Sequence, residues 1–406
     1  MASKPENLVV FVENLEKLDF FSRLREALTE RGHVLVMCAA RLSVIRTARR
    51  LGFECIPCRR ALVDADVSDC LEVLSGDLDE RQGRQRYGSV AQALRTIADS
   101  HHLTGALIWN GGRVADKAVA DHCAEQGLTC LYFEIGNIPG KMIADPAGVN
   151  ARSLLAGNGF ADRVEASDGF EQWRASFIED KLAQRSVPQA ASIGRINVHY
   201  LTDLLGFVAY GLARSNNRSV PALLRSALST RRVSLTCSTT TPAENYYFLP
   251  LQVTNDTQLF LNSSVDNKGA LEHAVGRCRE DGKKLVVKPH PAEKSARFLA
   301  WLDEYARHQE IHLCSHNTMA LIRNSDLVIT INSTVGLEAL LCGRPIEVLG
   351  QAVYKHFREQ DLDAYVNRYL LDIDYFSHAP IAEESVGEIL SRLRTGSIAC
   401  VNTQQG

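Results

Sequence analysis

The stretch DLVITINSTVGLEALLCGRPIEVLG (326–350) decides the fold that we expect for this chain. It begins as an apolar, β-rich run, passes through small hydroxyl residues into a helical segment that ends at Gly343, and closes on a second short apolar run. Two almost continuously apolar strands joined by a helix are typical of a parallel sheet that helices cover on both faces. The stretch therefore predicts an α/β domain.

The same alternation of strands and helices extends outward from this stretch. On its N-terminal side, strands are expected at 246–253, 283–291 and 311–315, and helices at 268–282, 296–309 and 317–325. An equivalent series opens the chain, with strands at 8–14, 33–39, 53–58, 106–112 and 128–136 and helices at 20–32, 42–52, 89–102 and 114–127. No sequence repeat links the two series. We therefore predict two similar, doubly wound domains.

The composition is that of an ordinary globular protein. Of the 406 residues, 45% are hydrophobic and 23% are charged, and the net charge of −3 gives no reason to expect a nucleic-acid partner. The longest weakly polar run, 204–213, is too short to cross a bilayer as a helix. Residues 1–14 contain no apolar signal core. We expect a cytoplasmic protein.

The eleven cysteines are odd in number and lie mostly in apolar runs, which is typical of reduced core thiols. Cys55 and Cys58 form a C-x-x-C motif, a spacing that zinc sites and redox dithiols use. A zinc site needs a second pair, and a thioredoxin-like motif should open a helix rather than end a strand. We interpret this pair as structural.

The predicted domain boundaries are 1–190 for an N-terminal Rossmann-like domain, 191–243 for a basic linker or interfacial segment, and 244–406 for a C-terminal Rossmann-like domain whose last helix crosses back. Residues 204–243 contain no Asp or Glu but five arginines: Arg214, Arg218, Arg225, Arg231 and Arg232. The segment is either a solvated linker or an electropositive surface for an anionic lipid or substrate. A helix over 199–214 fits a membrane interface or packing on a domain.

In open parallel sheets, ligands bind beyond the carboxyl ends of the strands, and two such strand ends are notable in the C-terminal half. Lys288-Pro289-His290-Pro291 closes one strand, and its two prolines fix the backbone so that a histidine projects beside a lysine. This pair suits a phosphate. The plain alternative is a turn with a surface histidine.

The second strand end is Asn332-Ser333-Thr334, where a helix begins at once and Gly336 allows close approach. Helix N-termini present free N–H groups and the positive end of the dipole, so they bind anions. Ser333 or Thr334 could equally be only a cap. Glu338, one turn further along, could reach a ribose diol or lie on the helix face.

Two further sets of polar residues follow strands. Gln252, Asn255 and Asp256 follow the first strand of the C-terminal half, where they form a turn or face a ligand. In the N-terminal half, Glu134 follows an apolar strand and precedes Gly136. A carboxylate held there is a candidate nucleophile or general base for glycosyl chemistry, or caps the turn.

Neighbouring polar residues of the N-terminal half complete the predicted site. Asn110, in a neighbouring strand end, could orient a ligand, and Asp145, Asn150 and Arg152 are expected on a loop.

With these residues in view, the chain resembles the bacterial capsule polysaccharide synthesis family, and within it the single-module retaining β-Kdo transferases. The segments that carry the resemblance are 110–111, 133–153, 246–258, 288–291 and 330–355. They follow the family's order over about residues 105 to 360. The first hundred residues add little beyond the strand–helix pattern.

The resemblance implies a GT-B fold, in which two Rossmann-like domains face each other across a cleft. It also implies transfer of Kdo (3-deoxy-manno-octulosonic acid) from CMP-Kdo to a phosphatidylglycerol-type lipid, which begins the poly-Kdo linker of the capsule. No metal and no other cofactor are implied, because protein groups replace the metal. The implied location is the inner face of the cytoplasmic membrane, beside other capsule biosynthesis and export proteins.

The resemblance also implies roles for single residues. His290, Ser333 and Thr334 would hold the CMP phosphate or ribose, with Gln252 and Asp256 lining the pocket of the sugar donor. Related enzymes commonly place two acidic residues in succession before the glycine of the strand-end motif, whereas this chain has Glu134 and Ile135. Either Glu134 or Asp145 would then serve as the catalytic carboxylate.

Two alternatives stay open beside this reading. One is a GT-B transferase or epimerase that uses another nucleotide sugar. The other is a non-catalytic component of capsule assembly or export.

Overall fold

The computed structural model describes residues 5–161, 167–183, 199–213, 235, 237–240, 245–254, 257–309 and 311–402. The chain divides into two compact units. Unit 1 comprises Met1–Ala161, Pro188–Ser219 and Arg368–Gly406, and unit 2 comprises Asp162–Val187 and Val220–Asn367. The chain therefore passes from unit 1 into unit 2 twice, and its last helix belongs to unit 1.

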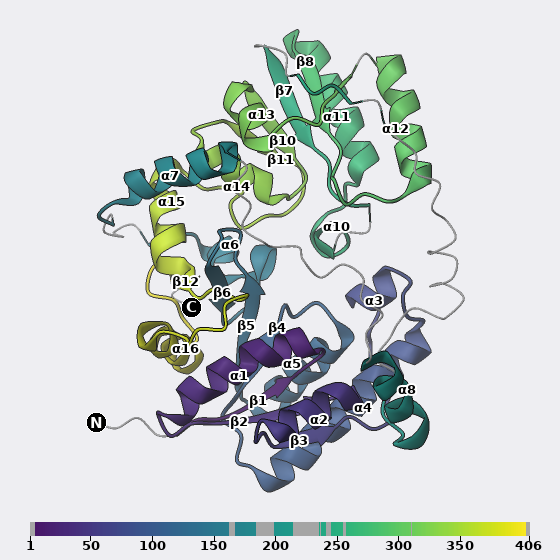
Figure 1. Ribbon diagram of the computed structural model, residues 1–406, viewed down its shortest axis with the longest axis vertical. Coiled ribbons are helices and arrows are strands. Elements are labelled where there is room, and N and C mark those ends of the chain that lie inside the picture. The colour runs from purple at the N-terminus through teal and green to yellow at the C-terminus, as the bar shows by residue number, and fades with distance from the viewer. Residues whose placement is uncertain are drawn as a thin grey trace. The chain divides into compact units, whose positions relative to one another are not determined.

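Unit 1 contains a seven-stranded sheet in the order β12-β6-β5-β4-β1-β2-β3 (Figure 1). Its strands are β1 Asn7–Phe11, β2 Val34–Ala39, β3 Cys55–Pro57, β4 Gly105–Trp109, β5 Thr129–Ile135, β6 Lys141–Asp145 and β12 Leu371–Asp372. The first five strands are parallel, and β6 and β12 pair antiparallel at one edge. The strands alternate with helices, as the periodicity of the sequence predicts.

Helices cover both faces of this sheet. The helices of unit 1 are α1 Leu15–Thr29, α2 Leu42–Arg50, α3 Leu71–Leu74, α4 Glu80–Ser100, α5 Val114–Gln126, α6 Leu154–Asn158, α8 His199–Ala209 and α16 Glu383–Thr395. Leu8 and Val10 of β1 pack with α1, α2 and α16, whereas Val9 points to the other face and packs with α4 and α5. Alternate residues of a strand thus build two cores, which explains why the strand reads as continuously apolar.

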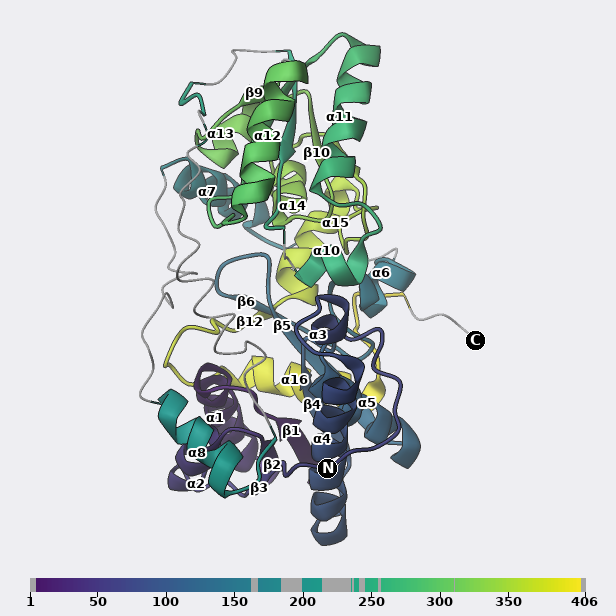
Figure 2. The same cartoon turned by 90° about the vertical axis from the view of Figure 1, so that its right-hand side faces the viewer.

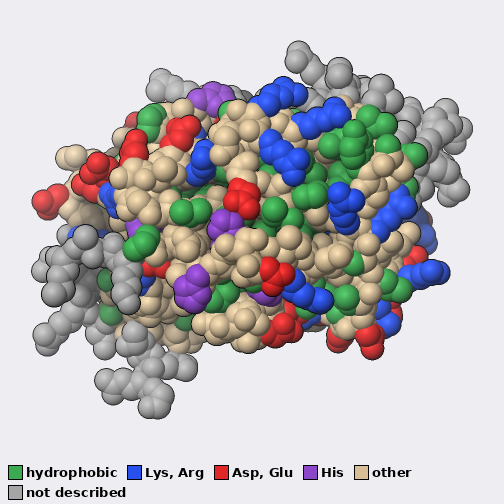
Figure 3. Space-filling model, turned by 90° about the horizontal axis from the view of Figure 1, so that it is seen from below, with side chains coloured by type: hydrophobic (Ala, Val, Ile, Leu, Met, Phe, Trp, Pro, Cys, Tyr) green, Lys and Arg blue, Asp and Glu red, His purple; other side chains and the backbone are tan. Residues whose placement is uncertain are grey.

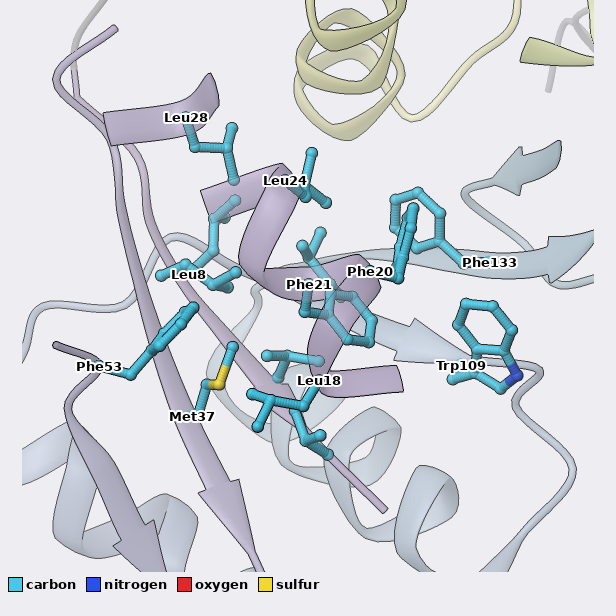
Figure 4. Close-up of a cluster of buried hydrophobic side chains, with 14 of the residues drawn as sticks. Leu8, Leu18, Phe20, Phe21, Leu24, Leu28, Met37, Phe53, Trp109 and Phe133 are labelled. Carbon is cyan, nitrogen blue, oxygen red and sulfur yellow. The ribbon is translucent and has the colours of Figure 1, made fainter. Parts of the chain in front are cut away.

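Figure 4 shows the core on the α1 face, where aromatic side chains from several elements meet near the carboxyl ends of β4 and β5. Phe20 of α1 lies with its ring centroid 5.7 Å from Trp109 and 5.9 Å from Phe133. Tyr375, from the C-terminal segment, lies 4.9 Å from Trp109. This aromatic cluster holds the turn that follows β4 in place.

Unit 2 contains a five-stranded, fully parallel sheet in the order β11-β10-β7-β8-β9. Its strands are β7 Tyr246–Pro250, β8 Lys284–Lys288, β9 His312–Leu313, β10 Leu327–Thr330 and β11 Ile346–Val348. Its helices are α7 Phe170–Leu182, α10 Thr257–Asn262, α11 Asn267–Asp281, α12 Ala296–Gln309, α13 Thr318–Asn324, α14 Thr334–Leu341 and α15 Glu359–Ala364. Tyr247 packs in the core beneath α11 and α12, and Tyr246 donates to Leu321 O of α13 (2.8 Å) on the opposite face. Figure 2 shows α11, α12 and α13 beside these strands.

The predicted α/β class with two Rossmann-like units is confirmed, and two details differ. We expected purely parallel sheets and placed Asp145 on a loop, whereas it ends β6, an antiparallel strand of unit 1. A short turn after Gly136 connects β5 to β6, and so short a connection allows only antiparallel pairing. All eleven cysteines are free and eight are buried, including Cys55 and Cys58, which agrees with the structural reading.

Candidate functional site

Unit 2 carries a pocket of ≈ 550 Å³ beyond the carboxyl ends of β7, β8 and β10. The predicted site residues that line it are Gln252, Lys288, His290, Asn332, Ser333, Thr334 and Glu338. Five segments that are far apart in the sequence supply the lining, including the end of α7 and the start of α13. The sequence analysis selected polar residues at the carboxyl ends of parallel strands, which we call the strand-end rule. The residues selected in this way lie up to 86 positions apart in the sequence, and the fold brings them to one pocket.

Lys288 and His290 give this pocket a cationic and a hydrogen-bonding group. Lys288 ends β8, and its Nζ donates to His316 O (2.7 Å) and Thr318 Oγ1 (2.8 Å). Burial lowers the pKa of Lys288. The Nδ1 of His290 accepts the N–H of Ala292 (3.1 Å), which leaves Nε2 as the N–H donor of the neutral ring. Both groups therefore suit an anionic ligand.

The strand β10 leads directly into α14, whose N-terminus forms another wall. Ser333 is the N-cap, and its Oγ accepts the N–H of Val335 (3.3 Å). Tyr354 donates a hydrogen bond to Ser333 O, and a Cβ on Gly336 would lie 2.5 Å from Cε2 of Tyr354. We expected Gly336 to permit close approach, and the group that approaches is this tyrosine ring. The ring fixes the helix end that faces the pocket.

Gln252 and Asn332 lie in the pocket wall and bond to each other. The Nε2 of Gln252 donates to Asn332 Oδ1 (3.0 Å), and Asn332 Nδ2 donates to Gln258 O (3.0 Å). Asn267 also bonds the backbone of Gln252 in both directions. Both amides are buried, so their first role is to tie the ends of β7 and β10 together. Asn255 and Asp256 lie outside the described residues.

The sequence analysis did not find all groups of this pocket. Lys181, at the end of α7, forms a 2.8 Å ion pair with Glu338, and Asn317 Nδ2 donates to Lys181 O (2.9 Å). Nothing in the sequence connects α7 with α14, because the two lie 157 positions apart. Asn317 and Thr318 follow β9, so the strand-end rule could have found them.

The predicted residues of unit 1 lie at the carboxyl ends of β4 and β5. Asn110 adopts a left-handed backbone (φ 68°), which Asn tolerates better than most residues, and its Nδ2 donates to Glu134 Oε2. Burial raises the pKa of Glu134 to about 7, although Asn110, Lys17 and Arg113 act against this shift. Asn110 and Glu134 thus form the contact that we expected between neighbouring strand ends.

A partly buried charge cluster adjoins Glu134. Glu13 accepts from Lys17 (2.7 Å) and from Arg113 (2.9 Å), and Glu72 pairs with Arg86 (3.1 Å). Burial alone would raise the pKa of Glu13, but Lys17 and Arg113 bring it to about 2. The cavity among these side chains measures only ≈ 20 Å³. Glu13 follows β1, so the strand-end rule would have found it as well.

Asp145 lies in a different environment from Glu134. It is fully buried, and its carboxylate accepts from the N–H groups of Ala147 (2.8 Å) and Leu154 (3.0 Å) and from Tyr369 Oη (3.0 Å). Burial raises its pKa, and these donors oppose the shift. The carboxylate anchors the turn after β6 to the C-terminal segment and lines none of the described pockets.

Several other expectations concern residues that are not described. The five arginines from Arg214 to Arg232 fall outside the described residues, as does most of the predicted linker. Within the part of the chain that is described, no helix is long and apolar enough to cross a membrane. Among the same residues, no three His, Cys, Asp or Glu side chains are placed to hold a metal ion.

Comparison with known proteins finds a family model that matches the part of the chain around this pocket. Residues 195–357, which include most of the pocket lining, match the sequence model described as "Capsule polysaccharide biosynthesis protein". Over this segment, which is less than half of its length, the chain is similar to the capsule polysaccharide biosynthesis family. The match agrees with the resemblance that the sequence motifs indicate.

Curated relatives agree with this family. The chain is 26% identical to "Protein FixF" of Sinorhizobium fredii over 252 residues, which is 61% of this chain and 48% of that protein. It is 32% identical to "Capsule polysaccharide export protein KpsS" of Escherichia coli over 121 residues, or 27% of this chain and 31% of KpsS. The chain thus spans about half, or less, of the length of these relatives.

Among solved structures, a chain described as "Thermosulfurimonas dismutans KpsC, beta Kdo 2,7 transferase" is similar with a TM-score of 0.47 and 13% identity. The likeness covers 95% of this chain and 99% of that chain. The UDP-GlcNAc 2-epimerase of Methanocaldococcus jannaschii is similar with a TM-score of 0.32 and 11% identity, over 97% of this chain and 100% of that chain.

Proposed function

We propose that this protein is a retaining glycosyltransferase of capsule biosynthesis that transfers β-Kdo from CMP-Kdo to a phosphatidylglycerol-type lipid. The observation that carries the proposal is the pocket of unit 2, where Lys288, His290 and the N-terminus of α14 line one cavity. A lysine, an imidazole N–H and a helix dipole together suit the phosphate of a nucleotide. The family match supplies the pathway.

The pocket also has the right size and polarity for a nucleoside monophosphate. Its ≈ 550 Å³ falls within the usual range for ligand sites, about 300–1,000 Å³. Lys288 and His290 are assigned to the phosphate, Ser333 and Thr334 to the phosphate or ribose, and Glu338 to the ribose diol. Gln252 and Asn332 shape the wall, and Asn255 and Asp256 remain proposed contacts of the sugar donor. The ammonium group of Lys288 neutralises charge on the departing CMP, and His290 donates a hydrogen bond to it.

Glu134 is the proposed nucleophile, with Asn110 as the residue that orients it. In the first displacement, a carboxylate oxygen of Glu134 bonds to the anomeric carbon of Kdo, and the bond to the phosphate oxygen of CMP breaks with its electron pair. In the second, an acceptor hydroxyl displaces the carboxylate and releases its proton. Two inversions retain the configuration. Asp145 is not assigned to this step, because its oxygens already accept several hydrogen bonds.

The test is a reaction with purified protein, CMP-Kdo and a short-chain phosphatidylglycerol analogue. We expect free CMP and a lipid heavier by one Kdo residue, both identified by mass spectrometry. If neither CMP nor glycosylated lipid forms at high enzyme concentration, the proposal is wrong in this form.

A transferase or epimerase with another nucleotide sugar is the second candidate, because no described side chain of the pocket is committed to one base. Thermal unfolding with CMP, UDP and GDP separates the two. Stabilisation by CMP above the others supports the main proposal, and stabilisation by UDP alone favours this alternative. A non-catalytic capsule component would bind nucleotide without any turnover of the sugar donor.

A further inference from the structure

The helix α8 packs on α2 through one side only. A Cβ on Gly206 would lie 2.8 Å from Leu42 Cβ, so the two helices are in close contact there. The N–H of Ser43, in the first turn of α2, donates to Asp203 Oδ1 (2.9 Å). Gly206 and Asp203 are three residues apart and therefore share the inner side of the helix. Figures 1 and 2 both show α8 beside α2.

The outer side of α8 and the residue that follows the helix, Tyr210, expose large apolar side chains. The exposed fractions of Leu205, Val208 and Tyr210 are 46%, 71% and 50%. Leu205 and Val208 are three positions apart, so they lie on one side of the helix. Single exposed apolar residues are common on protein surfaces, but a helix that groups several of them marks an interaction surface.

Arginines are concentrated in the segment of the chain on which α8 packs. Residues 41–60, which form α2, β3 and the adjoining turns, contain six arginines and one acidic residue, Glu54. Arg46, Arg50 and Arg59 are exposed and form no ion pair with any described residue. Figure 3 views the molecule from the end where α2 and α8 lie in Figure 1, and its right side shows Lys and Arg around hydrophobic side chains.

Arg60 joins this basic segment firmly to α8. Its guanidinium carbon lies 3.9 Å from the ring centroid of Phe207, and it donates to Phe207 O and to Leu212 O (3.4 Å). The N–H of Arg60 also donates to Gly211 O (3.0 Å). The basic segment 41–60 and the α8 region are therefore neighbours in unit 1.

We propose that this surface, the α2–α8 face, binds an anionic phospholipid bilayer. The α2–α8 face comprises Leu205, Val208 and Tyr210 together with Arg46, Arg50 and Arg59. Apolar side chains that enter the acyl boundary, with arginines beside them at the headgroups, are the features of a helix that lies in a membrane interface. The inference rests on the proposed function to the extent that a lipid acceptor must be reached at a membrane.

The charge pattern favours a bilayer over other occupants of this face. A free phosphate would engage the arginines but leave the three apolar side chains in water. A second copy of this chain would bring a like-charged arginine group against the first one, which costs free energy. An anionic bilayer matches both parts of the surface at once.

The test is co-sedimentation of the full chain with vesicles of phosphatidylcholine alone or with about 30% phosphatidylglycerol, without any sugar donor. We expect binding to the anionic vesicles that weakens with salt. Leu205→Ser/Val208→Ser should reduce partitioning into the vesicles at least tenfold, because it removes apolar side chains that enter the acyl boundary. Arg46→Glu/Arg50→Glu should also reduce partitioning at least tenfold, since each basic residue near an anionic surface contributes about fivefold. The matched controls are Leu74→Ser in α3 and Arg297→Glu/Arg307→Glu in α12, which should bind as the parent chain does.

Thermal unfolding and CMP binding show whether each variant is folded. Vesicle binding that is unchanged in both double variants overturns the inference, as does equal binding to neutral vesicles. A parent dimer that Leu205→Ser/Val208→Ser converts to a monomer would assign the face to a second copy and also overturns it. No sugar is transferred in this assay, so it tests the inference separately from the proposed function. Vesicle binding without transferase activity would contradict only the proposed function. Transferase activity on a soluble lipid analogue without vesicle binding would contradict only the inference.

Discussion

The two units end their parallel strands in different ways. In unit 2, the strand ends surround a pocket of ≈ 550 Å³, with Lys288 and His290 in its lining. In unit 1, charged side chains fill the space beyond β1 and β4, and only ≈ 20 Å³ remains among them. Parallel sheets of the same kind thus carry two different sites. The site of unit 2 is open and suits ligand binding, whereas the site of unit 1 is filled by charged side chains that influence the pKa of Glu134.

Electrostatics differ between the two regions as well. In unit 2, cationic groups outnumber the one pocket carboxylate, Glu338, which Lys181 already neutralises. In unit 1, Lys17 and Arg113 are paired with Glu13, and burial raises the pKa of Glu134 to about 7. The comparison teaches that a strand-end motif gives the place of a site, while the neighbouring charges decide its chemistry.

The largest effect should come from the carboxylate of unit 1. We expect Glu134→Gln to lower the rate of Kdo transfer about a thousandfold or more, because the amide cannot form the glycosyl ester. The affinity for CMP, measured by calorimetry, should not change. The matched control Glu125→Gln, at an exposed carboxylate of α5, should retain full activity. If Glu134→Gln keeps activity within tenfold of the parent, Glu134 is not the nucleophile. The contrast between a binding site in unit 2 and a catalytic carboxylate in unit 1 would then be wrong.

Asp145 should show its effect in stability rather than in catalysis. Asp145→Ala leaves buried N–H groups of Ala147 and Leu154 without an acceptor, and we expect a loss of about 3 kcal/mol in the free energy of unfolding, measured with urea. Tyr369→Phe removes one hydrogen bond to the same carboxylate and should cost about 1 kcal/mol. If Asp145→Ala unfolds like the parent but transfers no sugar, Asp145 belongs to the reaction instead.

Lys288 tests the binding role of unit 2. We expect Lys288→Ala to weaken CMP binding about tenfold to thirtyfold, since a charge-assisted bond to phosphate contributes roughly 1.5–2 kcal/mol. Cytidine, which carries no phosphate, should bind both proteins equally. Lys284→Ala, at the exposed start of the same strand, is the control for strand integrity. An equal loss for cytidine and CMP would show that Lys288 shapes the pocket without contacting phosphate.

Much of the fold could be predicted because each strand and the helix after it are formed by consecutive residues, so local sequence patterns indicate them. The helix expected at 296–309 is α12, and the strand ends at Lys288 and Asn110 were found from local pattern alone. The antiparallel strand β6 was missed because its last residue, Asp145, and the Pro146 that follows it are typical of a loop. Its pairing depends on β5, which local sequence does not show.

The candidate site could be predicted less completely than the fold. Lys181 reaches Glu338 from a helix 157 positions away, and Tyr354 fills the space beside Gly336. Such contacts arise from tertiary packing, which no spacing within one motif contains. Gln252 was a predicted ligand contact, yet its amide bonds to Asn332. A polar residue at a strand end can therefore hold the sheet together as readily as it binds a substrate.

The smallest expected effect is a shift in the pH dependence of kcat, and it tests how the charges around Glu134 in unit 1 set its pKa. As a nucleophile, Glu134 must be ionised, so the rate should rise with pH and level off above its pKa of about 7. Lys17 favours the ionised form of Glu134, so Lys17→Met should raise that pKa and move the midpoint upward by about one pH unit or less. The measurement is kcat from pH 5.5 to 9, with Lys117→Met, which pairs with Asp121, as the control. A midpoint that moves downward, or a rate that falls as pH rises through 7, would mean that the protonated carboxyl is the active form and that Glu134 acts as an acid.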